Sequence, residues 1–331
     1  MTDGLVMFSG GLDSVVTAHV LKSQGLSIKA VHFVLPFHSG IGYEHKAVRS
    51  YAEALGVPLI IVEEGEEYIE MIRDPHFGFG KNANPCVDCR IHRLTKAKKI
   101  MESEGASFIA TGEVVGQRPM SQRLECLASI EERSGLKGLL IRPLSAKLLE
   151  PTIPEVKGII NRNALFDFYG RSRKRQLAYA EKHGLIHSTP AGGCILTNEE
   201  TAKRFIELSS LKPQFTLTDF KLLAFGRHFR LDSGAKLVIA RTDAENFIIE
   251  KLVGSDGVIL DMAQIPGPLG VITGDFSDKE VTLAASMIAR YSKARLHDKV
   301  AVKVYTKGVE SILDVKPADE QVCSEYIVCK K

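Results

Sequence analysis

The chain has 331 residues, of which 44% are hydrophobic and 25% are charged. This is the composition of a globular protein that is long enough for two domains. The formal net charge of +3 neither indicates nor excludes a nucleic-acid partner. No apolar run approaches the roughly 18 residues of a membrane span, and no basic and apolar leader opens the chain, so we expect a cytoplasmic protein without a membrane partner.

The first predicted strand leads into a glycine-rich turn. Apolar residues 5–8 precede the sequence SGGLDS at positions 9–14, and an apolar helical pattern follows. Paired glycines allow a tight turn whose backbone N–H groups point into the loop, and the following helix adds its positive end, so an oxyanion is favoured there. No lysine follows the turn, which argues against a Walker-type P-loop.

Strand and helix patterns alternate through the rest of the first half. Expected strands cover residues 28–34, 58–62 and 106–111, and expected helices cover residues 44–55 and 91–104. This order predicts an α/β fold, with a parallel sheet that is covered by helices on both faces. Residues 74–86 show no periodicity, and we expect them to form a loop that serves a site.

The pattern changes beyond a predicted linker at residues 211–214. Before the linker, residues 124–144 contain two β-like runs and residues 154–208 look mostly helical. After it, residues 216–331 combine short β-rich runs with a helical stretch near residues 279–291. We therefore expect two domains, at residues 1–212 and 216–331, of which the second is a smaller α+β domain.

Three of the six cysteines indicate a metal or sulfur site. Cys86 and Cys89 form a Cys-x-x-Cys pair before a helix that we expect to start near Arg90, and Cys194 follows two glycines far downstream. Such a pair occurs as half of a zinc site, as a redox dithiol or as part of an iron–sulfur site. No second Cys pair or His pair completes a zinc site, whereas three cysteines suit a [4Fe–4S] cluster with one iron left open.

Two alternatives stay open for these cysteines. Two of them could carry sulfur through persulfide and disulfide chemistry, or the set could be structural, because free cysteine is among the most buried residue types. We expect Cys126, Cys323 and Cys329 to be ordinary core or surface residues.

Together these motifs resemble a known family. The turn at residues 9–14 is similar to the SGGxDS signature of PP-loop ATP pyrophosphatases. Residues 86–90 and 108–122, with their Thr-Gly-Glu and Gly-Gln...Ser-Gln motifs, resemble tRNA 4-thiouridine synthetases. The related tRNA 2-thiouridylases share the turn and an Asn-Pro-containing cysteine loop. The resemblance covers residues 4–200.

The resemblance implies tRNA thiolation. In that reaction a uridine carbonyl oxygen attacks the α-phosphate of ATP, pyrophosphate leaves, and sulfide displaces AMP; the sulfur comes from free sulfide or a sulfur-donor protein. By position, the ATP phosphates would be surrounded by Ser9, Gly10, Gly11, Asp13 and Ser14, with Mg²⁺ at Asp13. Adenine would face the main chain at His32 and Phe33, and Gly112 and Gln117 would lie close to the nucleotide. The [4Fe–4S] cluster would be held by Cys86, Cys89 and Cys194, which would act with Asp13 in catalysis.

Other features bear on the RNA partner. Because the turn begins at residue 9, we expect the RNA-binding modules that precede the PP-loop in 4-thiouridine synthetases to be absent. Residues 225–241 resemble the RNA-binding domain of the NFACT group, and we expect Arg227 and Arg230, with interleaved Phe225 and Phe229, to contact RNA. Residues 216–331 carry sixteen basic and sixteen acidic side chains, so a solvated edge strand is the competing interpretation.

The first half contains two further basic clusters. We expect one of them to track the tRNA backbone, and it consists of Arg171, Arg173, Lys174 and Arg175. The other, on residues 90–99, fits an RNA groove and the solvent face of an amphipathic helix equally well.

We therefore expect an ATP-dependent tRNA sulfurtransferase. The sequence is also compatible with a homodimer. A cluster-free persulfide-type tRNA thiouridylase is one alternative, and a PP-loop sulfurtransferase or ligase for a small molecule is another. An iron–sulfur RNA-binding regulator with a vestigial nucleotide site is the third, and the intact Ser9, Asp13 and Ser14 argue against it.

Overall fold

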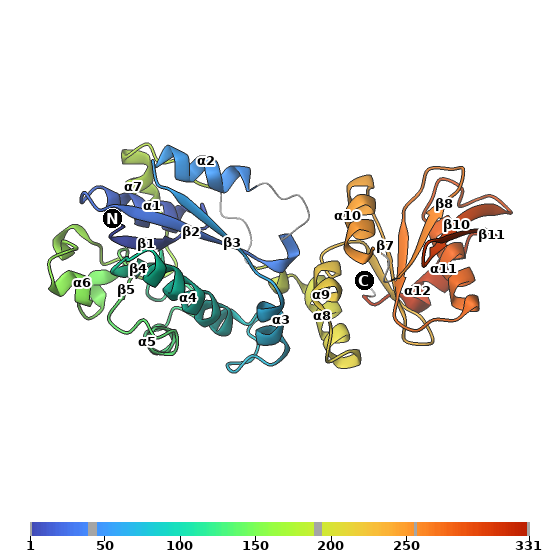
Figure 1. Ribbon diagram of the computed structural model, residues 1–331, viewed down its shortest axis with the longest axis horizontal. Helices are drawn as coiled ribbons and strands as arrows, with labels where there is room; N and C mark the ends of the chain where they lie inside the picture. The colour runs from blue at the N-terminus through green and yellow to red at the C-terminus, as the bar shows by residue number, and fades with distance from the viewer. Residues whose placement is uncertain (1, 39–44, 189–193, 255–256, 330–331) are drawn as a thin grey trace. The chain divides into compact units, whose positions relative to one another are not determined.

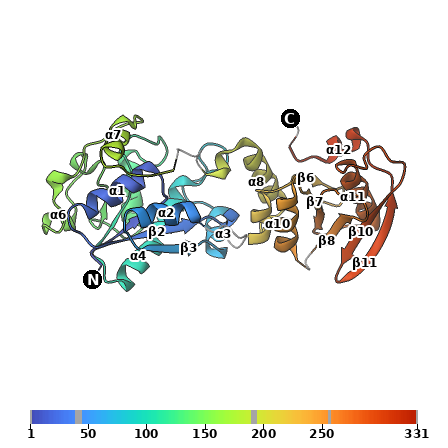
Figure 2. The same cartoon turned by 90° about the horizontal axis from the view of Figure 1, so that it is seen from above.

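The computed structural model describes residues 2–38, 45–188, 194–254 and 257–329. The chain divides into two compact units (Figures 1 and 2). The first unit comprises residues 1–35 and 42–193, and the second comprises residues 36–41 and 194–331. The division at residues 212–216 stays a prediction, and the two helices that it separates pack within the second unit.

The first unit is built on a five-stranded parallel sheet with the strand order β3-β2-β1-β4-β5. The strands are β1 (Gly4–Met7), β2 (Ile28–Val34), β3 (Leu59–Glu63), β4 (Phe108–Ala110) and β5 (Leu140–Ile141). Val6 of β1 lies opposite Ala30 of β2 and Ala110 of β4, so β1 is central. The predicted α/β fold is confirmed.

Helices cover both faces of this sheet (Figure 1). They are α1 (Leu12–Lys22), α2 (Lys46–Ala54), α3 (Glu66–Arg73), α4 (Cys86–Ser103), α5 (Leu124–Arg133), α6 (Ile153–Val156) and α7 (Lys174–Lys182). Successive strand residues point to opposite faces, so Val6 packs with α1, α2 and α7 while its neighbour Leu5 packs with α4 and α5. The sheet is therefore buried on both sides, as parallel sheets are.

Two local predictions in the first unit are wrong. Residues 124–133 form helix α5 and not a strand, because Leu127 and Ile130 are buried three positions apart on one helical face. Helix α4 begins at Cys86, earlier than the predicted start near Arg90, so both cysteines of the Cys-x-x-Cys pair belong to its first turn.

The second unit is an α+β domain with a six-stranded antiparallel sheet of order β11-β10-β8-β9-β7-β6. Its strands are β6 (Arg227–Arg230), β7 (Lys236–Ile239), β8 (Val258–Met262), β9 (Gly270–Thr273), β10 (Val300–Thr306) and β11 (Val309–Val315). Its helices are α8 (Glu199–Leu211), α9 (Leu217–Leu222), α10 (Asp243–Val253), α11 (Asp278–Arg290) and α12 (Glu320–Tyr326). One face packs against α10 and the other against α11 and α12, which confirms the predicted fold class of this part.

Residues 36–38 join the second unit although they follow strand β2 of the first. The ring of Phe37 stacks on Phe220 of α9 with centroids 4.4 Å apart, and both side chains are fully buried. In the part of the chain that the structure describes, every helix is too short or too polar to span a lipid bilayer.

Candidate nucleotide and thiolation site

The glycine-rich turn lies at the carboxyl edge of the sheet, where β1 meets α1. The strand order places β2 on one side of β1 and β4 on the other, so the order of successive strands reverses between β1 and β4. In open α/β sheets, ligands bind in the crevice outside the carboxyl ends of the strands at such a point. The turn therefore occupies the position that a nucleotide site requires.

Side chains and main chain within the turn hold its shape. The Ser14 hydroxyl donates to the Gly11 carbonyl oxygen at 2.8 Å, and the Ser9 amide donates to the Ser14 hydroxyl at 3.2 Å. Gly10 has a φ of +73°, in the left-handed region that favours glycine, and its carbonyl oxygen accepts a 2.9 Å hydrogen bond from the Ser188 amide. The turn is thus supported from within and by a segment far away in the sequence.

Gly112, just beyond β4, lies against the first turn of α1. A Cβ at this position would lie 2.7 Å from the backbone carbonyl of Asp13 and 2.9 Å from the Ser14 nitrogen. Contacts this short leave no room for a side chain. The absence of a Cβ lets the end of β4 and the start of α1 meet, which brings Gly112 into the same site as Asp13.

Asp13 is the acidic group of this site. Gln117 donates from Nε2 to Asp13 Oδ2 at 3.3 Å, and among the described residues Asp13 Oδ1 has no hydrogen-bond partner. Burial raises the pKa of Asp13, although the charges of Arg173 and Arg118 oppose the rise. A partly buried carboxylate oxygen with no partner suits a hard cation such as Mg²⁺.

Two segments bring the cations to Asp13. Tyr169 pairs with Val115 in a parallel bridge, and the Gly170 amide donates to the Val115 carbonyl oxygen at 2.8 Å. This pairing joins the segments that carry Arg118 and Arg173, and the charges of both arginines lower the pKa of Asp13. The site therefore combines a glycine turn, a carboxylate and two guanidinium groups, which are the groups that a magnesium–triphosphate complex needs.

The two cysteines of the first turn of α4 lie beside a buried charge cluster. Cys86 and Cys89 are both half-buried free thiols, three residues apart on one helical face. Arg90 follows them, and burial together with the charge of Arg118 lowers its pKa to about 10, against the opposing influence of the two cysteines. The Arg90 guanidinium therefore follows the two thiols directly in the first turn of α4.

Glu113 anchors Arg90. The Glu113 carboxylate is 3% exposed; it forms an ion pair with Arg90 and accepts from Arg142 Nε at 2.9 Å and from the Thr111 hydroxyl at 3.1 Å. Arg142 in turn pairs with Glu131 of α5 at 2.8 Å. This buried network holds the start of α4 against the end of β4. Glu113 belongs to the predicted Thr-Gly-Glu motif, but the sequence indicated no role for this residue. No sequence pattern indicated Arg142.

Cys194 is assigned to the second unit, and the residues 190–193 that precede it lie outside the described residues. It is half-buried and leads into a short 3₁₀ turn, in which Thr197 donates from its hydroxyl to the Cys194 carbonyl oxygen at 2.6 Å. Within the described ranges, no three His, Cys, Asp or Glu side chains are grouped so that they could hold a metal ion. The structure thus brings Cys86 and Cys89 together within the first unit, whereas Cys194 belongs to the second unit.

His32 and Phe33 lie near the carboxyl end of β2. His32 is held by a 2.8 Å contact from Nδ1 to the Phe8 carbonyl oxygen, and burial lowers its pKa. Phe33 is 8% exposed, with the Arg93 guanidinium 6.0 Å from its ring centroid. Both residues therefore lie on the edge that carries the glycine turn, and their contact with adenine stays a prediction.

The predicted basic cluster before α7 divides into different environments. Arg171 and Lys174 are exposed, whereas Arg173 is half-buried and influences Asp13. Arg175 pairs with Asp167 at 2.6 Å and lies 4.4 Å from the ring centroid of Phe168. Of this cluster, Arg171 and Lys174 are exposed and form no ion pair with another described residue.

The basic run on α4 is largely neutralised by acidic partners. Lys96 lies 3.0 Å and Arg93 3.7 Å from the buried carboxylate of Glu64, and Lys98 lies 3.9 Å from Glu102. Together with the Arg90–Glu113 pair, these contacts favour the solvent-face interpretation of residues 90–99 over an RNA groove.

In the second unit, the predicted run of alternating basic and aromatic residues does not form one surface. Arg227 lies over Tyr291 at 4.6 Å, whereas Arg230 donates from Nη1 to the Gly234 carbonyl oxygen at 2.7 Å and pairs with Glu207 of α8. Phe229 is fully buried and cannot stack on a base. The expected stacking face is wrong, because successive strand residues point to opposite faces.

The comparisons with known proteins agree with this geometry. The strand order, the glycine turn and the partly buried carboxylate of Asp13 form the arrangement expected of a nucleotide site in an open α/β sheet. Residues 1–150 match the family described as thiamine biosynthesis protein (ThiI), and residues 226–327 match the NFACT protein RNA binding domain. Residues 1–150 are thus similar to the first of these families, and residues 226–327 are similar to the second.

Individual relatives are distant. The tRNA-specific 2-thiouridylase MnmA of Bradyrhizobium sp. (strain ORS 278) is 30% identical over 143 residues, which cover 38% of this chain and 36% of that protein. This chain thus spans little more than a third of that relative. The U34-tRNA thiolase NcsA from Methanococcus maripaludis with its [4Fe-4S] cluster aligns at 15% identity and a TM-score of 0.32, covering 67% of this chain and 70% of that chain. A 4-thiouridine synthetase in complex with RNA and ATP aligns at 23% identity and a TM-score of 0.35, covering 54% and 50%.

Proposed function

We propose that this protein is an ATP-dependent tRNA sulfurtransferase that replaces a uridine carbonyl oxygen with sulfur. One arrangement carries the proposal: Gly112 lies against the backbone of Asp13, and its neighbour Glu113 forms an ion pair with Arg90, which directly follows Cys89. The nucleotide turn and the thiols are therefore linked through neighbouring residues of the first unit. A ligase that only adenylates its substrate needs the nucleotide turn but not the thiols.

The chemistry assigns a task to each group. The uridine carbonyl oxygen attacks the α-phosphorus of ATP and the bond to the β-phosphate oxygen breaks, so pyrophosphate leaves. The backbone N–H groups of the turn, with Arg118 and Arg173, stabilise the charge that develops on pyrophosphate, and Asp13 holds Mg²⁺. Sulfide then adds to the activated carbon and AMP leaves with the original oxygen, so no net oxidation or reduction takes place.

We propose that Cys86, Cys89 and Cys194 bind a [4Fe–4S] cluster. Thiolates are the ligands that these clusters take, and all three cysteines are half-buried. When bound through three cysteines, such a cluster supplies an open iron for an exchangeable sulfur ligand. The alternative is a persulfide on one cysteine, whose outer sulfur goes to the nucleotide while a second thiolate forms the disulfide.

Iron analysis separates these two routes. Anaerobically purified protein should contain iron and acid-labile sulfide, and Cys86→Ala, Cys89→Ala and Cys194→Ala should each lose most of both. Cys126→Ala is the matched control, since Cys126 is also half-buried but lies on α5 outside the proposed set. Iron-free wild-type protein, or full iron in all three variants, would establish the persulfide route instead.

The substrate class is tested by pyrophosphate release. We expect unmodified tRNA to stimulate ATP cleavage to AMP and pyrophosphate, and the stimulation to weaken as salt rises, because phosphate contacts release counterions. Equal release with and without tRNA would favour a small-molecule ligase, which was the competing expectation.

A further inference from the structure

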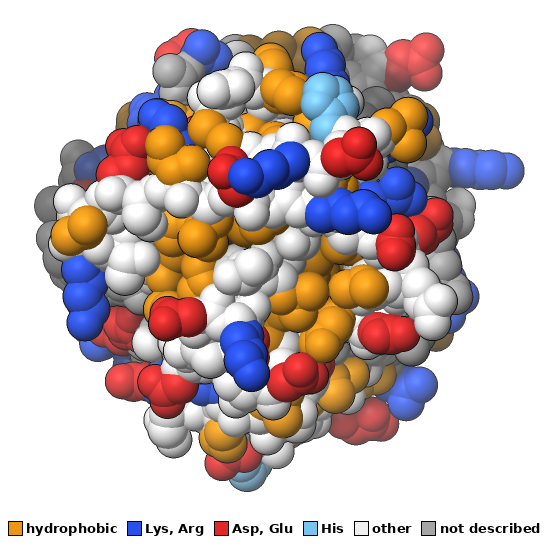
Figure 3. Space-filling model, turned by 90° about the vertical axis from the view of Figure 1, so that its right-hand side faces the viewer, with side chains coloured by type: hydrophobic (Ala, Val, Ile, Leu, Met, Phe, Trp, Pro, Cys, Tyr) orange, Lys and Arg blue, Asp and Glu red, His pale blue; other side chains and the backbone are white. Residues whose placement is uncertain are grey.

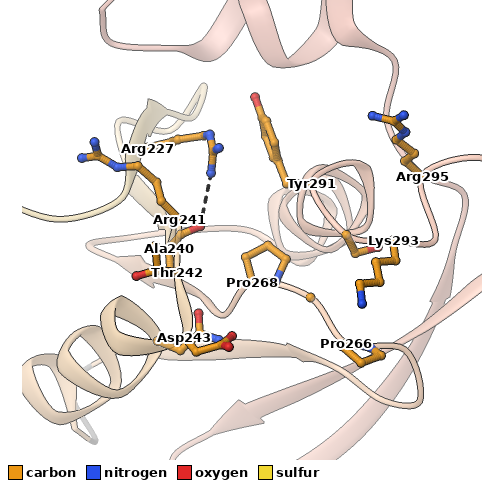
Figure 4. A pocket seen from close by; sticks show the side chains of 13 residues that line it. Arg227, Ala240, Arg241, Thr242, Asp243, Pro266, Pro268, Tyr291, Lys293 and Arg295 are labelled. Carbon is orange, nitrogen blue, oxygen red and sulfur yellow. Dashed lines mark hydrogen bonds between the residues drawn. The ribbon is translucent and has the colours of Figure 1, made fainter.

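The second unit contains a basic pocket that no part of the proposed thiolation chemistry uses. Its volume is about 580 Å³, and it lies between the β6–β7 edge, the start of α10 and the segment after α11. Figure 4 shows Arg227 and Arg241 on one side, Lys293 and Arg295 on the other, and Tyr291 and Pro268 between them. Asp243 is the acidic residue among the lining side chains.

The walls of the pocket are firmly packed. A Cβ at Gly267 would lie 2.5 Å from Met262 Cγ and 2.8 Å from Ser292 Cβ, so the Pro-Gly-Pro turn is wedged between β8 and the end of α11. The Ser292 hydroxyl donates to the Ala289 carbonyl oxygen at 2.7 Å and accepts from the Ala294 amide at 3.0 Å. These contacts fix the segment that presents Lys293 and Arg295, so the pocket is preformed.

The positively charged side chains that line the pocket differ in whether they form ion pairs with acidic residues. Arg241 lies 3.7 Å from Glu245, whereas no described residue forms an ion pair with Lys293 or Arg295, and both are exposed. Arg227 donates to the Ala240 carbonyl oxygen at 3.3 Å and lies 4.6 Å from the Tyr291 ring centroid. The pocket thus offers two available cations beside an aromatic and guanidinium platform.

This local charge stands out against its surroundings. Residues 216–331 carry sixteen basic and sixteen acidic side chains, and the face of the second unit in Figure 3 shows both signs interspersed. A duplex backbone requires a broad positive surface, whereas a single nucleotide needs a cation for its phosphate and a flat group for its base. Tyrosine rings and arginine planes are the platforms on which proteins stack unpaired RNA bases.

We propose that this pocket binds one unpaired nucleotide of the RNA substrate, with its phosphate at Lys293 and Arg295 and its base on the Tyr291–Arg227 platform. The inference rests on the RNA substrate of the proposed function and deepens it, because it specifies how the second unit holds that RNA. A single-stranded segment of the tRNA supplies such a nucleotide, and free AMP is a second source of the same chemistry.

Fluorescence anisotropy with the full chain and a short labelled single-stranded RNA, in the absence of ATP, tests the pocket. We expect Lys293→Ala/Arg295→Ala and Tyr291→Leu each to weaken binding by about tenfold or more, and Tyr291→Phe, which keeps the ring, to bind like wild type. The matched control is Lys279→Ala/Lys316→Ala, which removes the same charge from exposed residues outside the pocket lining and should change affinity by less than about twofold.

Four outcomes would contradict the binding of an unpaired nucleotide in this pocket. The pocket variants could bind RNA as tightly as wild type, or the control variant could lose as much affinity as they do. A blunt RNA hairpin could bind as tightly as the single strand, or AMP could displace the labelled RNA at an equal concentration. None of these outcomes contradicts the proposed thiolation activity, because the binding experiment does not measure ATP cleavage. Failure of the wild type to bind any RNA would instead contradict the proposed function together with the pocket.

Discussion

Gly112 lies directly against the backbone of Asp13, although Gly112 belongs to the connection after β4 and Asp13 to the first turn of α1, just after the connection from β1. The contact holds the end of β4 and the first turn of α1 at a spacing that no other residue type permits. Because the two connections flank the crevice of the sheet, this contact sets the width of the proposed nucleotide site.

Substitution of Gly112 by alanine should therefore weaken ATP binding. The added methyl group would lie 2.7 Å from the Asp13 carbonyl oxygen, and the resulting displacement should cost about 1–3 kcal/mol of binding free energy. Isothermal titration calorimetry with ATP and Mg²⁺ measures the effect. Gly65→Ala is the control, since Gly65 has a φ of −127° and nothing lies within 4 Å of its added Cβ. Equal affinities in the two variants would remove Gly112 from the site.

Asp13→Asn should separate stability from activity. Burial raises the pKa of Asp13, so the folded chain holds a costly negative charge at neutral pH, and the neutral amide should raise the midpoint of thermal unfolding. Pyrophosphate release should fall by about a hundredfold or more, because the ligand for Mg²⁺ is lost. Differential scanning fluorimetry and a pyrophosphate assay give the two readouts. Release at the wild-type rate would refute the role of Asp13.

The buried network at Glu113 should dominate the stability of the first unit. Glu113→Gln leaves Arg90 and Arg142 without their shared carboxylate, which should lower the free energy of unfolding by roughly 3 kcal/mol. Glu132→Gln is the comparison, because its partner Lys137 is 4.0 Å away and both are exposed, and it should change stability by less than about 0.5 kcal/mol. Urea unfolding followed by circular dichroism distinguishes them. Similar midpoints for the two variants would show that the network is not structural.

The second unit should lose stability in acid through Glu280. Burial alone would raise the pKa of Glu280, but hydrogen bonds from Ser233 and Ser277 outweigh burial and lower it from 4.5 to about 2. Because the folded state holds this proton less tightly than the unfolded chain, the stabilisation is present above pH 4.5 and is lost as pH falls toward about 2.

Glu280→Gln should accordingly lower the stability at neutral pH by about 1 kcal/mol and flatten the pH dependence in that window. Unfolding midpoints of wild type and variant, measured across the acid range, provide the test. Parallel pH profiles for the two proteins would assign the acid sensitivity to other groups.

Local features of the fold were predictable from the sequence. Strand β2 coincides with the predicted residues 28–34, and the glycine turn could be located because its requirements lie within six consecutive residues. The helix at residues 124–133 was missed, because short apolar runs fit a strand pattern and a helix pattern alike.

The partners within the site depend on long-range topology. Gln117 and Asp13 are 104 positions apart in the chain, and Arg142 and Glu113 are 29 apart, so no local pattern indicates either contact. The basic pocket was missed for the same reason: Arg227, Tyr291 and Lys293 line one pocket only after the sheet and α11 have packed. The contiguous run from Arg227 to Arg230 was misleading, because a strand divides it between two faces.

The most direct test is mass spectrometry of nucleosides from unmodified tRNA incubated anaerobically with the protein, ATP, Mg²⁺ and sulfide. We predict one thiouridine that forms together with AMP and pyrophosphate in equal amounts, and that is absent with Asp13→Asn. ATP cleavage in the presence of tRNA without any thionucleoside would contradict the assignment of this protein as a tRNA sulfurtransferase.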